Sequence, residues 1–201
     1  MLPLLGVVLS GVLASAQPAS KTGIVKGAIT ISGKPTQDAV VAIEGLPKET
    51  GKPRDAKLKA PHAVMDQREM KFVPRVLAVV AGTIVDFSNN DKTWHNVYST
   101  SDAKKFDLGL YPPPKTRSAT LDKPGVVRIL CNVHPAMEAF IVVKDHPYYA
   151  TTEKRGNYEI ENVPLGKYTV EVWHPESGTK KLPFELVREG QVLVLDIDLK
   201  K

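Results

Sequence analysis

The stretch "LCNVHPAM", residues 130–137, gathers donor atoms that the rest of the chain uses sparingly. It holds the one cysteine, Cys131, together with His134 and Met137, in a chain of 201 residues that has five histidines and four methionines. Thiolate, imidazole and thioether groups bind soft and borderline metal ions. The Pro-Ala pair at 135–136 favours a tight loop that returns the later donors toward the cysteine sulfur. The spacing therefore predicts a metal-binding loop.

A further donor lies upstream. His95 stands in "FSNNDKTWHNVYS", where a polar loop leads into a predicted strand, and Cys131 ends the buried-strand pattern "VVRIL". One thiolate, two imidazoles and a weak axial thioether are the donor set of a type 1 (blue) copper site. We therefore expect one mononuclear copper ion, held by His95, Cys131, His134 and Met137.

Three other interpretations of these residues stay open. A lone buried cysteine is often a small hydrophobic residue of the core. Zinc is a second alternative, but methionine is a poor zinc ligand. A catalytic cysteine with a histidine base is a third, and it would need a partly exposed thiolate near a helix end.

The elements that must position these donors are short strands, punctuated by Gly, Pro, Asn and Asp. No segment has an amphipathic helical pattern, so the predicted class is all-β, with sandwich or barrel layers. Residues 46–62 are polar, contain three prolines and are predicted to be a linker. In the strand around 168, Tyr168, Val170 and Val172 alternate with Lys167, Thr169 and Glu171, which predicts a half-buried strand. The strands are predicted at 23–31, 38–45, 76–91, 95–99, 117–121, 125–131, 139–144, 156–174 and 181–200.

Residues 1–16 have the pattern of a signal peptide. A short apolar run ends in the small-x-small site Ala14-Ser15-Ala16, although no Lys or Arg precedes the run. We expect cleavage and export, to the periplasm in particular, with a buried N-terminal helix or an uncleaved membrane anchor as alternatives. Exported proteins use cysteine mostly in disulfides, and a single cysteine cannot form an internal one. Cys131 must therefore be inert, form an intermolecular bond or have a function.

Composition narrows the classes of partner. The formal net charge is +5, but the basic residues are scattered rather than clustered, so no nucleic-acid partner is expected. No paired carboxylates or catalytic triad are evident, so we expect neither an enzyme nor a small-molecule substrate. The excess of positive charge favours an acidic protein partner.

The segment around the donors resembles a known family. "CNVHPAM" is similar to the Cys-x-x-His-x-x-Met ligand loop of cupredoxins, with the short spacing of amicyanin and pseudoazurin, and "MDQREMKFVPRVLAVVAGTIVDFSNNDKTWHNVYS" resembles the first half of that family. The resemblance covers residues 63–145. It implies a Greek-key β-sandwich with His95, Cys131, His134 and Met137 as copper ligands. More closely, the whole chain resembles exported plastocyanin-like proteins often labelled methylamine-utilisation proteins.

The same resemblance implies supporting residues. Asn96 is expected to tie two loops together and to point its backbone N–H at the thiolate, and Asn89 or Asn90 is expected to support the loop before His95. Val133 is a departure, because amicyanin-like loops carry proline there. Our hypothesis is that its N–H donates to the Cys131 sulfur and raises the reduction potential.

Residues 23–46 and 148–201 are each too short in strands to form a core alone. Together, "GKPTQDAVV" and "GNYEIENVPLGKYTVEV" resemble a carboxypeptidase-regulatory or transthyretin-like β-sandwich. The predicted fold is thus a cupredoxin sandwich inserted in a small transthyretin-like sandwich, and strands within 23–45 should pair with strands within 156–198. The alternative is an N-terminal strand added to the cupredoxin sheet.

The predicted function is a periplasmic carrier of single electrons, with His134 as the electron port and an acidic c-type cytochrome or oxidoreductase as partner. A copper storage or delivery module, and a surface interaction protein in which copper is incidental, are the alternatives. Trp94 is expected either to cover the metal or to dock a partner. The remaining histidines, His62, His146 and His174, are predicted to be surface or hydrogen-bonded residues.

Overall fold

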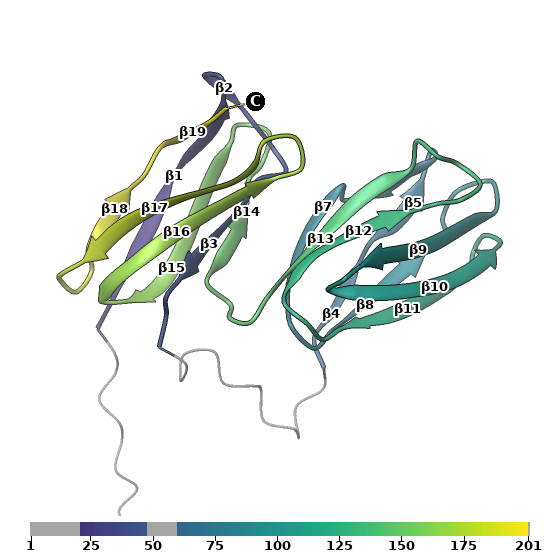
Figure 1. The fold of residues 1–201 in the computed structure, drawn as a ribbon, viewed down its shortest axis with the longest axis horizontal. Helices are drawn as coiled ribbons and strands as arrows, with labels where there is room; N and C mark the ends of the chain where they lie inside the picture. Colours follow the sequence, from purple (N-terminus) through teal and green to yellow (C-terminus); the bar gives the residue numbers. More distant parts are fainter. Residues whose placement is uncertain (1–20, 48–59, 201) are drawn as a thin grey trace, which may run out of the picture.

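The structure, a computed structural model, describes residues 21–47 and 60–200, and all regular secondary structure in these ranges is β-strand (Figure 1). The predicted all-β class is therefore confirmed. Within the described residues no helix has the length and apolar character needed to cross a membrane. The predicted signal peptide, residues 1–16, and most of the predicted linker, 46–62, lie outside the described residues.

Two groups of strands lie side by side in Figure 1, and we call them the inner part (residues 60–144) and the outer part (residues 21–47 and 145–200). The inner strands are β4 (His62–Val64), β5 (Asp66–Arg68), β6 (Lys71–Val73), β7 (Val76–Val80), β8 (Thr83–Ser88), β9 (His95–Ser101), β10 (Lys104–Tyr111), β11 (Thr116–Leu121), β12 (Gly125–Leu130) and β13 (Glu138–Lys144). The outer strands are β1 (Thr22–Ile31), β2 (Lys34–Pro35), β3 (Val40–Glu44), β14 (Tyr149–Thr151), β15 (Asn157–Pro164), β16 (Gly166–His174), β17 (Gly178–Leu186), β18 (Val192–Val194) and β19 (Ile197–Leu199).

The inner part is a sandwich of two larger sheets, and β5 and β6 form a separate two-stranded sheet. One sheet has the order β10-β9-β12-β13-β7, and the other has the order β11-β8-β4. Alternation along β8 shows how the sequence forms this core: Thr83, Val85 and Phe87 are buried, while the residues between them are half-buried. The core includes Cys131 and Met137, so the sandwich itself holds two of the predicted donors.

The outer part is built from two segments that are far apart in the sequence. Strand β1 pairs antiparallel with β15 and parallel with β18 and β19, and β3 pairs antiparallel with β14 and β16. The predicted pairing between residues 23–45 and residues 156–198 is therefore observed. No strand of the segment that precedes the inner part pairs with a described inner strand, as the alternative would have required.

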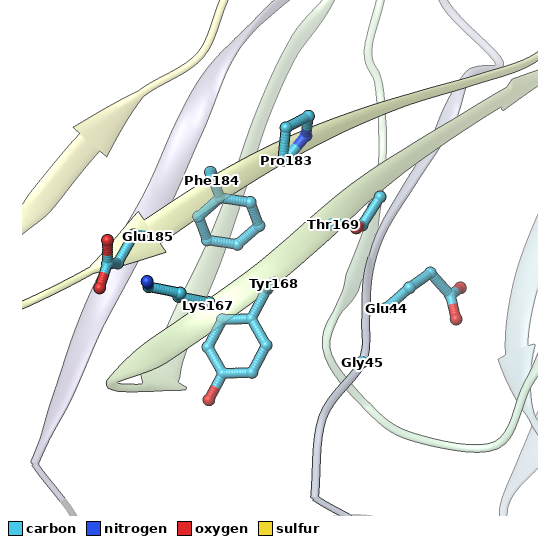
Figure 2. A pocket seen from close by; sticks show the side chains of 8 residues that line it. All are labelled: Glu44, Gly45, Lys167, Tyr168, Thr169, Pro183, Phe184 and Glu185. Carbon is cyan, nitrogen blue, oxygen red and sulfur yellow. The ribbon is translucent and has the colours of Figure 1, made fainter.

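A shallow groove opens on the outer part between β16, β17 and the end of β3 (Figure 2). The rings of Tyr168 and Phe184 face each other there at a centroid distance of 5.8 Å. Both side chains also belong to the outer core, so the groove is a depression over packed rings and not a deep cavity.

The two parts pack face to face. Along β13, Ala139, Ile141 and Val143 enter the inner core, whereas Phe140 and Val142 join a separate apolar cluster with residues of the outer part. That cluster consists of Val40, Val76, Val142, Ala78, Val126, Phe140 and Trp173. Strand β13 is thus covered on both faces, which explains its unbroken apolar run.

The polar face of β16 is partly covered by the inner part. Trp173, on the same face as Glu171, packs edge-on against Phe140 with the ring centroids 5.4 Å apart. The Glu171 side chain is only 18% exposed, because Lys144 of the inner part lies over it. The half-buried strand predicted here is confirmed by the alternating burial of β16, and a second sheet packs on its polar face near Glu171. Alternation along one strand reveals its own core, and it does not reveal a neighbouring layer.

Ion pairs border the apolar contact. The Lys144 Nζ lies 2.8 Å from Glu44 Oε1 and 2.6 Å from Glu171 Oε1, and Lys181 binds the other oxygen of Glu171. Burial alone would lower the pKa of Lys144, but its hydrogen bonds to the two glutamates outweigh burial and raise it. The charged form of Lys144 is therefore held between the two parts.

Candidate metal centre

Three of the four predicted donors converge at one end of the inner sandwich. His95 begins β9, Cys131 follows the last residue of β12, and His134 lies in the loop between β12 and β13. The Nδ1 atoms of His95 and His134 are 3.0 Å apart, and the Cys131 sulfur is 3.9 Å from His134 Nδ1. One donor atom from each residue lies within 4.8 Å of the others. These separations are close to those of ligands that share one ion.

The burial of the donors is graded. His95 is fully buried and Cys131 is 4% exposed, whereas His134 is half-buried. Strand pairing explains this gradient, because His95 pairs with Tyr111 inside the sheet while His134 lies in a loop beyond the strand ends. His134 is thus the donor side chain through which the group meets the surface.

Met137 closes the ligand loop. Its N–H donates a hydrogen bond to the carbonyl of His134 at 2.9 Å, and its side chain is 1% exposed in the same core as Cys131. The tight loop expected from the Pro-Ala pair is therefore present. The axial role of the Met137 thioether stays a prediction.

Asp91 sets the tautomer of the His95 ring. The sequence analysis did not identify this residue as part of the site. Its Oδ2 lies 2.9 Å from His95 Nε2, and an ionised carboxylate can only accept a hydrogen bond. The hydrogen bond network therefore assigns the ring proton to Nε2 and leaves the Nδ1 lone pair facing Cys131 and His134. The one sequence signal for Asp91 was a carboxylate four residues before a predicted ligand in a polar loop.

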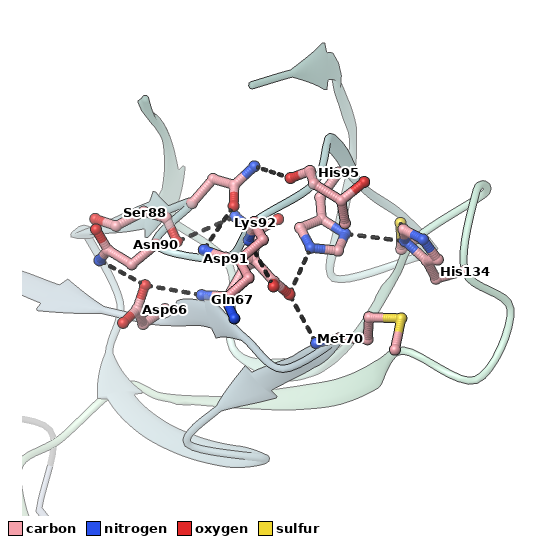
Figure 3. Close-up of polar contacts among 12 residues, drawn as sticks. Asp66, Gln67, Met70, Ser88, Asn90, Asp91, Lys92, His95 and His134 are labelled. Carbon is pink, nitrogen blue, oxygen red and sulfur yellow. Dashed lines mark hydrogen bonds and ion pairs between the residues drawn. The ribbon is translucent and has the colours of Figure 1, made fainter. Parts of the chain in front are cut away.

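The Asp91 carboxylate is itself held by the backbone. Oδ2 also accepts a hydrogen bond from the Met70 N–H at 2.7 Å, and Oδ1 accepts one from the Lys92 N–H at 2.7 Å (Figure 3). Burial tends to raise the pKa of Asp91, but these hydrogen bonds and the one from His95 bring it down to about 2. Asp91 is therefore a carboxylate at neutral pH.

The asparagines of the predicted support are all engaged. The amide of Asn96 donates to Asp107 at 2.7 Å, and its oxygen accepts from the N–H of Asn132 at 3.4 Å. It therefore connects β9 to β10 and to the ligand loop. Asn90 donates to Asp66 at 2.9 Å and anchors the loop before His95 to strand β5.

Asn89 is fully buried, and its amide donates to the carbonyls of Thr93 and Tyr111. Both asparagines named for this loop thus hold it, through different contacts.

Val133 does not make the contact that the sequence suggested. Within residues 21–47 and 60–200, the Cys131 sulfur has a hydrogen bond with His134 and none with the N–H of Val133, whose side chain is 46% exposed. The physical reason is the loop direction, which carries residue 133 outward before the chain turns back at Met137. The hypothesis of a second donor to the sulfur loses its basis.

The other histidines stay outside the donor group. His62 is exposed and lies 3.1 Å from Asp86. His174 and His146 are buried, and each accepts a backbone hydrogen bond at Nδ1, from Glu176 and Tyr148 respectively. Burial lowers the pKa of both, so they are neutral core residues at pH 7 and not surface residues.

The donor set fits type 1 copper better than its alternatives. A thiolate and two imidazoles with prearranged lone pairs suit a copper ion, and a nearby thioether is a poor zinc ligand. A catalytic cysteine is disfavoured because Cys131 is buried and has no helix end beside it in the described chain. The core alternative is only half right, since Cys131 packs in the core but turns its sulfur to His134.

Comparison with known proteins agrees with this geometry. Residues 60–144 match the family described as copper binding proteins, plastocyanin/azurin family, so the inner part is a cupredoxin domain. The predicted cupredoxin segment, residues 63–145, overlaps this match. No curated protein matches the chain.

Several solved structures are similar to part of the chain. A purple cupredoxin from Nitrosopumilus maritimus is 19% identical with a TM-score of 0.36, over 42% of this chain and 99% of that one. Amicyanin from Paracoccus versutus is 19% identical with a TM-score of 0.39, over 52% and 97%. A copper-containing nitrite reductase from Thermus scotoductus SA-01 is 22% identical with a TM-score of 0.41, over 50% and 27%.

Proposed function

We propose that this protein is an exported carrier of single electrons, and that His95, Cys131, His134 and the thioether of Met137 would hold one mononuclear type 1 copper ion. The observation that supports this most directly is the convergence of donor atoms from His95, Cys131 and His134. Asp91 also orients the His95 ring so that its Nδ1 lone pair faces the other two donors. When bound, the copper would supply a one-electron redox couple.

The surroundings favour electron transfer over chemistry on a substrate. Cys131 and His95 are buried and fixed by strands and hydrogen bonds, so the donors keep their positions when the charge of the site changes. A fixed donor set lowers the reorganisation cost of each electron transfer. Half-buried His134 provides the short route from the site to a partner.

The surface around His134 suits a protein partner. Large apolar side chains are exposed beside the donor residues: Met70 at 57%, Trp94 at 53%, Leu110 at 47% and Val133 at 46%. Trp94 is among them, and docking is the role we propose for it. Apolar patches of this kind mark interaction sites.

Charge suggests which partner docks. Lys71 and Lys92 directly follow Met70 and Asp91 in the chain, and both are exposed. Positive groups around an apolar contact steer acidic proteins and weaken their binding as salt rises. We propose an acidic c-type cytochrome or oxidoreductase as the partner.

For the outer part we propose a docking or spacing role as a split carboxypeptidase-regulatory or transthyretin-like module. Its support is the pairing of β1 and β3 with strands that follow the inner part. We also propose that residues 1–16 direct export to the periplasm. Fractionation of cells that express the full chain tests the location, since retention of the uncleaved chain in the cytoplasm would contradict it.

The decisive experiment is the visible spectrum of the copper-loaded protein beside that of Cys131→Ser. We expect an intense thiolate-to-copper band in the first and none in the second, and reversible one-electron voltammetry in the first. Ser99→Ala is the control, because it removes a buried hydroxyl from the same strand as His95 without touching a donor, and it should keep the band. A colourless copper complex of the unmodified protein would refute the proposal.

A second function, delivery or storage of Cu(I), is favoured by one observation. Met70 presents an exposed thioether next to the donor group, and thioethers bind Cu(I) well. A stable blue centre that cycles rapidly supports electron transfer, whereas ready loss of colourless Cu(I) to a chelator supports delivery.

A further inference from the structure

His134 is the least buried residue of the donor group. His95 is fully buried and Cys131 is 4% exposed, so an incoming ion must first meet His134 and whatever lies beside it. A single half-buried imidazole is a weak and unselective ligand. A second soft donor beside His134 would therefore strengthen the first binding of a copper ion at the surface.

Met70 lies on this side of the donor group. It is in the turn between β5 and β6, and its side chain is 57% exposed although it is large and apolar. Figure 3 shows the thioether on the side of the His134 ring, beyond the Asp91 carboxylate. The other methionine of this region, Met65, is fully buried in the inner core and cannot serve as a surface donor.

The backbone at Met70 is unusual for this residue type. Glu69 and Met70 have φ values of 51° and 54°, in the left-handed region that turns of this kind normally fill with Gly, Asn or Asp. A methionine there adds backbone strain and exposes apolar surface, so neither local preference nor core packing explains it. The packing of the core therefore does not account for a methionine at this position.

One carboxylate oxygen connects this turn to the donor group. Asp91 Oδ2 accepts hydrogen bonds from the Met70 N–H at 2.7 Å and from His95 Nε2 at 2.9 Å. The Met70 backbone is thus positioned by the same atom that orients a ligand imidazole. A strained turn that is tied in this way keeps its side chain on the side of His134.

We propose that Met70 is a capture ligand for Cu(I): its thioether, with the imidazole of His134, binds the ion at the surface before Cys131 and His95 take it up. The soft sulfur selects Cu(I) over harder ions. In the second stage the thiol of Cys131 gives one proton to solvent and binds as thiolate, Met70 is released, and the oxidation state of the ion does not change. This proposal rests on the proposed copper site.

The test is the rate of Cu(I) uptake by the metal-free full chain from a chromogenic Cu(I) chelator, followed by the loss of chelator colour. Met70→Leu keeps the size and apolar character of the side chain and removes the thioether. We expect uptake to slow about tenfold, the effect of about 1.4 kcal/mol on a barrier. Met65→Leu, the same change at the buried methionine, should leave the rate unchanged.

A direct readout accompanies the rate. In the Cys131→Ser variant, labelled with ¹³C at methionine methyl groups, added Ag(I) should shift the resonance of Met70 and not that of Met65. Equal uptake rates for Met70→Leu and the unmodified chain, or an unshifted Met70 resonance, would overturn the capture role. Failure of the unmodified chain to bind Cu(I) would instead refute the copper site itself, and reduced uptake in both leucine variants would assign the effect to general loosening of the fold.

Discussion

Replacing Asp91 by Asn tests whether a carboxylate prearranges the donor group. The amide keeps the shape of the side chain but has one accepting oxygen, so it cannot serve the N–H groups of Met70, Lys92 and the His95 ring together. One of these donors must then face the amide NH₂ or remain without an acceptor. The first consequence is lower stability of the metal-free protein.

The magnitude follows from the pKa of Asp91. Lowering it from 3.8 to about 2 is worth about 2.5 kcal/mol at 1.36 kcal/mol per pKa unit. Solvent screening reduces this value because Asp91 borders a surface loop, so we expect Asp91→Asn to lose about 1–2 kcal/mol at pH 7.

Since the pKa is lowered by folding, the contribution is present above the ordinary value of 3.8 and is lost as the pH falls toward 2.

Urea denaturation of both metal-free proteins at pH 7 and near pH 2 measures the effect. Asp102→Asn is the matched control, because that side chain is 96% exposed and its nearest cation is 3.5 Å away, and it should change stability little. Equal stability of Asp91→Asn and the unmodified chain at pH 7 would refute the reasoning. A loss that persists unchanged at pH 2 would show that the charge of Asp91 is not its origin.

Three further predictions concern the rest of the chain. Lys144→Met should cost about 2 kcal/mol in urea denaturation at pH 7, because Glu44 and Glu171 are left facing each other at the contact between the parts. This loss should shrink as the pH falls below 4.5, since the lysine contacts lower the pKa of Glu171 against the effect of burial, and a loss independent of pH would contradict this reasoning. Val133→Pro should leave the reduction potential of the copper-loaded protein nearly unchanged in a voltammogram, because no N–H of Val133 binds the sulfur, and a large drop would restore the original hypothesis. Cleavage within 46–62 by limited proteolysis should leave the two products associated on gel filtration, because β1 and β3 pair with strands of the second product, and their separation would count against a single outer module.

The donor loop could be predicted from the sequence because its information is local. Cys131, His134 and Met137 are rare residue types at short spacing, and a tight loop is enough to bring them together. His95 was predictable by its position at the start of a strand, although its distance from Cys131 depends on the pairing of β9 with β12.

Asp91 was not predictable on the same grounds. Carboxylates are common in polar loops, and whether one faces His95 depends on loop conformation, which neither periodicity nor spacing determines. The outward direction of Val133 depends on the same kind of information. The donor residues could therefore be predicted from the sequence, whereas the contacts that loop residues make with them could not.

The contact between the two parts was missed for another reason. An unbroken apolar run such as "AFIVVK" in β13 signals a strand covered on both faces, yet it does not say what covers the second face. The alternation in β16 likewise identified the core of that strand and gave no sign of the second sheet that covers Glu171. Each of these strands is covered by a strand of the other part, and the arrangement of the two parts cannot be read from the pattern of a single strand.

This double coverage bears on the donor group through β13. The ligand loop ends where β13 begins, and β13 is held on one face by the inner core and on the other by Phe140 and Val142 against the outer part. Lys144 fixes the far end of the same strand through two glutamates. A site keeps its geometry when the elements that carry it cannot shift. The outer part therefore supports the donor group without touching it, by removing the freedom of the strand from which the loop departs.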